Sequence, residues 1–139
     1  MNLFIRRSKN KEKIFYNWKI EKQCLNLIFE AAKSTYPNEF GGLLRVDNNH
    51  KYTISEIIIL PGTIQGDSHT IFQLHMMPVD FNIVGTIHSH PSTSFFPSNA
   101  DLQLFQKHGR IHIISAYPYD IKSFKSYNNF GNIINLEIV

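Results

Sequence analysis

The sequence predicts an α+β fold, a mixed and mostly antiparallel β-sheet flanked by two main helices. Three observations favour it: short segments rich in β-branched residues follow one another with polar turns between them, apolar residues have helical spacing once early in the chain, and a helix-start signal occurs once late. The chain has 139 residues, 42% of them hydrophobic, which suits a single domain with a buried core. We divide it into an N-terminal extension, residues 1–18, and one domain, residues 19–139.

The first helix is expected within residues 19–37. Five apolar residues there have helical spacing and are expected to face the core: Ile20, Cys24, Leu27, Ile28 and Ala31. Lysine and glutamate occupy the other face, and Pro37 ends the helix.

Seven segments are predicted as strands: residues 40–46, 51–60, 70–76, 81–90, 110–119, 121–128 and 134–139. The polar turn at residues 47–50 joins the first two, and the second is apolar enough at residues 57–60 to be buried on both faces. The second helix is expected from Ser98 to Gly109. Ser98 suits the N-cap, Asp101 three positions later completes a variant capping box, and Gly109 favours a helix end.

Charge and composition exclude several classes of protein. The net charge is +3, with five basic residues between Arg6 and Lys13, which we interpret as a solvated extension. The rest of the sequence has neither an arginine-rich stripe nor an aromatic platform, so we expect no nucleic-acid binding. No apolar run approaches the roughly 20 residues that a membrane span needs, so we expect no membrane insertion. The N-terminus lacks the hydrophobic segment of a signal peptide, and Cys24 is the single cysteine, so we expect a cytoplasmic protein with an inert core thiol.

Two histidines stand out by their spacing. His88 and His90 are two positions apart in a predicted strand, so their side chains project from the same face and can converge on one point. Pro91 then ends the strand, which places both imidazoles at an accessible end of the sheet. The other histidines have no such partner and are expected to be ordinary surface or core residues.

Asp101 adds a third candidate ligand, in the first turn of the second helix. Two histidines and one carboxylate are found at catalytic zinc with a fourth position open, and also at non-haem iron, so the ligand types alone leave the metal undecided. A hydrolytic site also needs a base for its water. Glu39 stands out among the carboxylates because it lies between Pro37 and the glycine pair that opens a strand, where its side chain can face a cleft.

Together these residues resemble the JAMM motif, also called MPN-plus: a glutamate, then H-[ST]-H-P, then S-x-x-D, with ten residues between the second histidine and the aspartate. Here Glu39 precedes GGLL, HSHP occupies residues 88–91, and PSNAD occupies residues 97–101. The chain is most similar to the short, single-domain prokaryotic branch, which includes archaeal-type members. The resemblance implies an MPN/JAMM-like catalytic domain with cytidine-deaminase-like layering.

By this resemblance the chain is a zinc metalloprotease that hydrolyses amide or isopeptide bonds after the C-terminus of ubiquitin-like proteins. His88, His90 and Asp101 would bind one Zn²⁺ per chain, Glu39 would be the general base, and Ser98 would stabilise the oxyanion or hold the water. The chain lacks space for the insertions with which larger members contact ubiquitin. The resemblance therefore implies a compact ubiquitin-like or sulfur-carrier protein, whose Gly-Gly tail would add a strand to an exposed sheet edge beside the zinc.

The sequence leaves two other functions open. A non-catalytic MPN-type scaffold would only bind proteins, but such scaffolds have usually lost the ligands that this chain keeps. An unrelated H-x-H hydrolase of the metallo-β-lactamase kind would need an Asp-His pair soon after His90, which is absent. The sequence does not distinguish a monomer from a homodimer.

Overall fold

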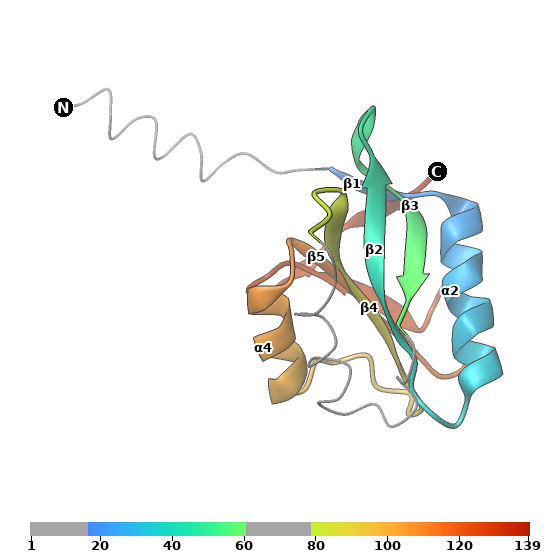
Figure 1. Cartoon of the computed structure of the whole chain (residues 1–139). Coiled ribbons are helices and arrows are strands. Elements are labelled where there is room, and N and C mark those ends of the chain that lie inside the picture. The colour runs from blue at the N-terminus through green and yellow to red at the C-terminus, as the bar shows by residue number, and fades with distance from the viewer. Residues whose placement is uncertain (1–16, 61–78) are drawn as a thin grey trace.

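The computed structural model describes residues 17–60 and 79–139 (Figure 1). In chain order its elements are β1 (Trp18–Ile20), α2 (Lys22–Thr35), β2 (Gly41–Asp47), β3 (His50–Ile59), β4 (Ile83–His90), α4 (Asn99–Lys107), β5 (Ile111–Ala116), β6 (Phe124–Tyr127), β7 (Ile133–Ile134) and β8 (Leu136–Ile138). The strand predicted at residues 70–76 lies outside the described residues, as do residues 1–16, so the predicted boundary at residue 18 stays a prediction.

The eight strands form one sheet in the order β7-β6-β5-β4-β2-β3-β1-β8. The pairs β2–β3, β2–β4, β5–β6 and β6–β7 are antiparallel, whereas β4–β5, β1–β3 and β1–β8 are parallel. The predicted α+β class, with a mixed and mostly antiparallel sheet, is therefore confirmed.

The two helices of the described residues lie on opposite sides of the sheet (Figure 1). Successive side chains of a strand point to opposite faces, and β2 shows the result. Leu44 joins the core beneath α2, whereas Leu43 packs with Leu104 of α4. On β5, Ile113 likewise belongs to the α2 core, and Ile114 packs against Phe105 of α4. The sheet thus has two apolar faces, each covered by a helix.

Strand β1 was not predicted. Ile20, assigned by its spacing to the first helix, instead lies in β1, where it is fully buried and pairs with Ile54 of β3. A three-residue strand has too few residues for a period to show, and its partners are far away in the sequence. Helix α2 confirms the predicted helix, but Leu27 is 58% exposed, and the buried face is formed by Cys24, Leu25, Ile28, Phe29 and Ala32.

The prediction that residues 57–60 are buried on both faces is wrong. Ile59 is 54% exposed, and Ile57 and Ile58 are only partly buried. Leu60, immediately after β3, is buried against Leu43 and Leu104. Ile58 also packs against this cluster beneath α4, and Ile57 packs against the core beneath α2, so the run reaches both cores but Ile59 stays exposed.

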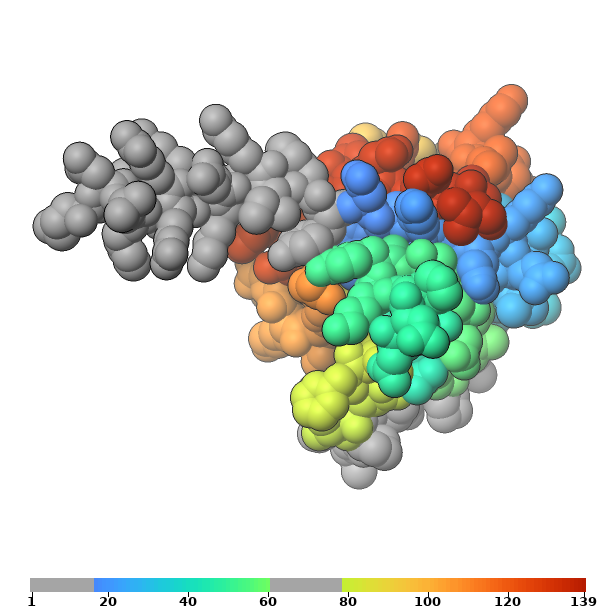
Figure 2. All heavy atoms as spheres, turned by 90° about the horizontal axis from the view of Figure 1, so that it is seen from above, coloured from blue at the N-terminus to red at the C-terminus, as the bar shows by residue number. Residues whose placement is uncertain are grey.

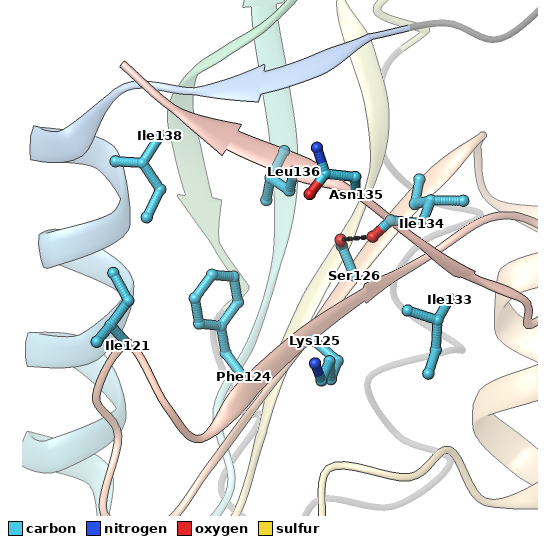
Figure 3. Close-up of a pocket in the computed structure, with 9 residues that line it drawn as sticks. All are labelled: Ile121, Phe124, Lys125, Ser126, Ile133, Ile134, Asn135, Leu136 and Ile138. Atoms are coloured by element: carbon cyan, nitrogen blue, oxygen red, sulfur yellow. Dashed lines mark hydrogen bonds between the residues drawn. The ribbon is translucent and has the colours of Figure 1, made fainter.

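The C-terminal strands bring the two ends of the sheet together. Asn135 alone separates β7, at one end of the strand order, from β8 at the other, so the sheet curves until its ends meet. Figure 2 shows the last residues beside the first described ones, in agreement with the β1–β8 pairing. A pocket of about 430 Å³ lies between β6 and this segment (Figure 3), lined by Phe124, Leu136 and Ile138 among others.

Candidate metal centre

Strand β4 carries both predicted histidine ligands and is held on both sides. It pairs with β5 from Gly85 to His90 and with β2 from Ile83 to His88. The close approach to β5 depends on Gly85, because a Cβ there would lie 1.4 Å from the carbonyl oxygen of Ile111. His88 and His90 project from the face that α4 covers, and their ring centroids are 5.1 Å apart.

The third predicted ligand comes from the start of α4. Ser98 is the N-cap, and its Oγ accepts a hydrogen bond from the N–H of Asp101 at 3.1 Å. In return, Oδ2 of Asp101 accepts a hydrogen bond from the N–H of Ser98 at 2.9 Å. The predicted capping box is therefore confirmed, with an aspartate at its third position. It fixes the Asp101 carboxylate at the helix end that faces the histidines.

The three side chains converge as predicted. Nε2 of His88 is 3.0 Å from Oδ1 of Asp101, and Nε2 of His90 is 3.3 Å from Oδ2. One ligand atom from each residue lies within 4.8 Å of the others, and this is the one cluster of potential metal ligands found among residues 17–60 and 79–139. These side chains are 13–15% exposed, so the cluster is mostly buried but still in contact with solvent.

The donor set fits a divalent metal ion. Neither nitrogen of His88 makes a hydrogen bond although both are buried, because the 3.0 Å contact with Asp101 lacks hydrogen-bond angles. A buried polar atom without a hydrogen bond is costly, and a metal ion beside Nε2 would satisfy it. Nδ1 of His90 is 2.9 Å from the carbonyl oxygen of Ser94. Donation of Nδ1–H to that carbonyl would leave Nε2 with a free lone pair, as a metal ligand requires.

Electrostatics also favour a cation here. Burial alone would raise the pKa of the Asp101 carboxyl, but contacts with His88 and His90 and the N–H of Ser98 hold it well below its usual value. Burial would lower the pKa of His90, but Asp101, the Ser94 carbonyl and the charge of Glu39 raise it overall. The surroundings therefore favour an ionised Asp101 carboxylate and a positive charge at His90. A metal cation can supply that positive charge when the histidine protons are released on binding.

Glu39 lies beside the same cluster. Gly41 of β2 pairs with His88, and the carbonyl oxygen of Phe40 accepts a hydrogen bond from the N–H of Ser89, so the chain at Glu39 lies near the end of β4 that carries His90. Glu39 is half-buried, and its charge contributes to the raised pKa of His90. The structure therefore brings together all five predicted site residues, whose roles remain proposals.

The predicted addition of a substrate strand beside the zinc stays a prediction, but the described sheet excludes β4 as the strand that would receive it. The sheet has no exposed edge at the strand that carries the histidines, because β4 lies between β2 and β5 in the described sheet. Its pairing with β5 reaches His90, and Ser89 is bonded to Phe40 on the other side. A substrate tail cannot add a strand to β4 itself.

Sequence reasoning missed three residues around the cluster. The backbone carbonyl of Ser94 orients the His90 ring. Every residue has such a carbonyl, so the residue type at position 94 could not indicate this role. Ser89 bonds to Phe40, 49 positions away. Phe105 lies one helical turn after Asp101, its ring 6.4 Å from that of His88 and stacked at 4.4 Å on that of His112. Its i+4 spacing from Asp101 could have identified it as a neighbour of the site.

Comparison with known proteins agrees with this geometry. The family model described as prokaryotic homologs of the JAB domain matches residues 21–127, which include Glu39 and the three candidate ligands. The chain belongs to this family. It is a short prokaryotic member of the JAMM group, as the motif predicted.

Individual relatives of the JAB-domain family support the assignment. A protein of Haloferax volcanii named "Probable metalloprotease" is 33% identical over 127 residues, which cover 86% of this chain and 78% of that protein. A solved JAB1/MPN domain protein from Archaeoglobus fulgidus has a TM-score of 0.71 and 38% identity, covering 90% of this chain and 100% of its own. A structure described as "JAMM: A Metalloprotease-like Zinc Site in the Proteasome and Signalosome" has a TM-score of 0.70 and 39% identity, covering 89% and 99%.

This JAB-domain chain shows no membrane-spanning helix in its described part, since neither α2 nor α4 has the length and apolarity needed to cross a bilayer.

Proposed function

We propose that this chain is a zinc-dependent metallopeptidase that hydrolyses amide or isopeptide bonds after the C-terminus of ubiquitin-like or sulfur-carrier proteins. The observation that carries the proposal is the convergence of His88, His90 and Asp101, with Nε2–Oδ distances of 3.0 and 3.3 Å, and with Glu39 near enough for its charge to raise the pKa of His90. The family, the Haloferax volcanii relative named a probable metalloprotease, and the similarity to a JAMM zinc site support it.

His88, His90 and Asp101 would hold the zinc through their Nε2 atoms and a carboxylate oxygen. Two histidines and a carboxylate leave one coordination position of a tetrahedral zinc site open. Bound zinc supplies Lewis acidity, which lowers the pKa of water to about 7 and polarises a carbonyl. The contact between Nδ1 of His90 and the Ser94 carbonyl oxygen orients the His90 ring, and the capping box orients the Asp101 carboxylate.

Glu39 would act as general base and then as general acid. Its carboxylate takes a proton from the attacking water and delivers it to the nitrogen of the leaving amine, so one residue serves both steps. Ser98 would donate its hydroxyl hydrogen to the developing oxyanion. This hydroxyl can still donate, because in the capping box Oγ acts as the acceptor of the Asp101 N–H.

A compact substrate suits a short chain of this family. The described structure covers β4 on both sides, so the tail of the substrate would approach the cluster from the exposed loop between Pro91 and Ser98. Burial raises the pKa of the Cys24 thiol to about 12, with the charges of Glu21 and Glu56 adding to it, so Cys24 is not the nucleophile. An inert single cysteine is consistent with the predicted cytoplasmic location; that location, one zinc per chain, and the choice between monomer and homodimer stay predictions.

The deciding experiment compares Glu39→Gln with the wild-type chain. The variant should keep its zinc but lose at least about 100-fold in kcat on a ubiquitin-like conjugate, because it removes the base and leaves the ligands intact. Product is measured by mass, and zinc by elemental analysis. A chelator should abolish wild-type cleavage, and added zinc should restore it.

Asp101→Asn is the matched control, since it also replaces a carboxylate by an amide but at a proposed ligand. It should lose both zinc and activity. Full activity of Glu39→Gln would refute its role as base. A zinc-loaded wild type that binds ubiquitin-like proteins without cleaving any conjugate would instead indicate a scaffold.

A further inference from the structure

Ser89 lies between the two histidine ligands but faces the other way. Side chains alternate along β4, so His88 and His90 project toward α4 and Ser89 toward the core beneath α2. Ser89 is fully buried. Its Oγ accepts a hydrogen bond from the N–H of Phe40 at 2.9 Å, and its own N–H donates to the carbonyl oxygen of Phe40 at 3.0 Å. A single serine thus holds both backbone polar groups of Phe40.

This contact fixes the backbone that carries Glu39. In a regular antiparallel pair the N–H of Phe40 would bond to a backbone carbonyl of the facing residue. Here the Ser89 hydroxyl takes that place. The N–H of Phe40 belongs to the peptide group that joins it to Glu39, so the orientation of that peptide determines where the Glu39 side chain starts. The other end of this anchor is the strand of the ligands His88 and His90.

We propose that Ser89 is a positioning residue, whose hydroxyl sets the Glu39 carboxylate relative to the metal ligands. This inference rests on the proposed function and deepens it. Rate depends steeply on such placement, since a shift of about 1 Å in a catalytic group can cost about 100-fold. Ser89 does not touch the substrate or the metal; it acts through Phe40 and Glu39.

Ser115 provides a matched control in the same sheet. It pairs with Ser89 in the β4–β5 register and is also fully buried. Unlike Ser89, its Oγ has no hydrogen-bond partner. Ser89→Ala and Ser115→Ala each remove one buried hydroxyl, from neighbouring positions of the sheet. Only Ser89→Ala removes the hydrogen bond to the backbone N–H of Phe40, next to Glu39.

The experiment measures kcat, KM and zinc content of Ser89→Ala and Ser115→Ala on the same ubiquitin-like conjugate. Ser89→Ala should lower kcat about 10- to 100-fold, with zinc content and KM unchanged, whereas Ser115→Ala should leave kcat within about twofold of wild type. Ser89→Thr and Ser89→Val introduce side chains of nearly the same shape, but threonine keeps a hydroxyl where valine has a methyl group. The threonine variant should recover most of the rate that the valine variant lacks.

A double-mutant cycle separates positioning from a general structural effect. In the Glu39→Gln background, followed in single turnovers, Ser89→Ala should cause almost no further loss, because the carboxylate it positions is gone. An equal loss in both backgrounds, a normal kcat of Ser89→Ala, or unfolding of both the alanine and valine variants would overturn the positioning role. These results leave the proposed function intact if Glu39→Gln remains inactive; an active Glu39→Gln defeats the base itself.

Discussion

Two histidines of the same fold have opposite electrostatic surroundings. His90 faces a carboxylate, and its pKa is raised by Asp101, the Ser94 carbonyl and Glu39 against the effect of burial. His112, in β5, is fully buried, and burial lowers the pKa of its imidazole to about 4. Its Nδ1 is 2.7 Å from Oγ1 of Thr86, and its Nε2 is 3.2 Å from the Gly109 carbonyl oxygen. The neutral ring thus satisfies both of its nitrogens.

The first prediction is that His112 lowers the stability of the folded chain at acidic pH. The unfolded chain protonates this histidine near its usual pKa of 6.5 and the folded chain only near 4, so the unfolded state binds more protons between these values. Lowering the pH from about 6.5 to 4 should therefore reduce the free energy of unfolding, by about 3 kcal/mol from this group. The measurement is urea unfolding of chelator-treated wild type and His112→Gln at several pH values. The variant should lose this part of the pH dependence, and parallel curves would contradict the prediction.

Residue-scale reasoning from the sequence identified the candidate ligands because their relation is local or follows from a motif. To infer that His88 and His90 share a face, it was enough to predict that their segment is a strand. To infer that Asp101 lies at a helix start, it was enough to recognise the cap at Ser98. The contact of Ser89 with Phe40 has no such signal. It joins residues 49 positions apart through a backbone N–H, which every residue except proline offers.

Helix α4 joins two tasks at one end. The carboxylate of Asp101 completes the capping box through the N–H of Ser98 and also faces His88 and His90. The start of the helix and the geometry of the proposed ligands therefore depend on the same side chain. Gly109, with a φ of 118°, follows the other end and allows the chain to turn directly into β5.

The second prediction separates the two tasks of Ser98. Ser98→Ala should cost about 1 kcal/mol of stability, whereas Ser98→Gly should cost only a few tenths, because glycine is tolerated at an N-cap. Both lose the hydroxyl proposed to stabilise the oxyanion, so both should lose about 100-fold or more in kcat. Thermal unfolding and steady-state kinetics test this pair. If activity followed stability, with glycine near wild type, Ser98 would be only a cap.

Elements with a clear local pattern were predicted well. Strands β2 to β6 within the described residues and helices α2 and α4 have apolar periods, caps or turns that require few residues to recognise. Strand β1 was missed because it has three residues, and it is ordered by β3 on one side and β8 on the other. The exposure of Ile59 was missed because an apolar run does not reveal which of its residues the opposite helix covers.

The two ends of the described chain are in direct contact with one another. Strand β8 pairs with β1 along Trp18–Ile20, the N–H of Lys22 at the start of α2 donates to the carbonyl oxygen of Val139, and the N–H of Val139 donates to Ile20. Leu136 and Ile138 pack against the main core. The last strand is therefore part of the structure that holds the first strand and the first helix.

The third prediction tests this closure. The double variant Leu136→Ala/Ile138→Ala should lose about 2–4 kcal/mol of unfolding free energy, because two partly buried aliphatic side chains leave the core. Glu137→Ala, an exposed change on the same strand, should stay within about 0.5 kcal/mol of wild type. Urea unfolding measures both, and hydrogen exchange at Lys19 should accelerate in the double variant alone. Equal effects of the two changes would contradict a role in the core.

The pairing of β1 with β8 also has a consequence for biosynthesis. A ribosome releases the N-terminal strand long before the C-terminal one, and β1 has its β8 partner only after residue 138 has left the exit tunnel. Until then β1 lacks one of its two neighbours in the described sheet, and an unpaired strand edge can pair with other chains. The proposed ligands His88, His90 and Asp101 all precede β8 in the sequence, so all three are synthesised before this last strand can complete the sheet.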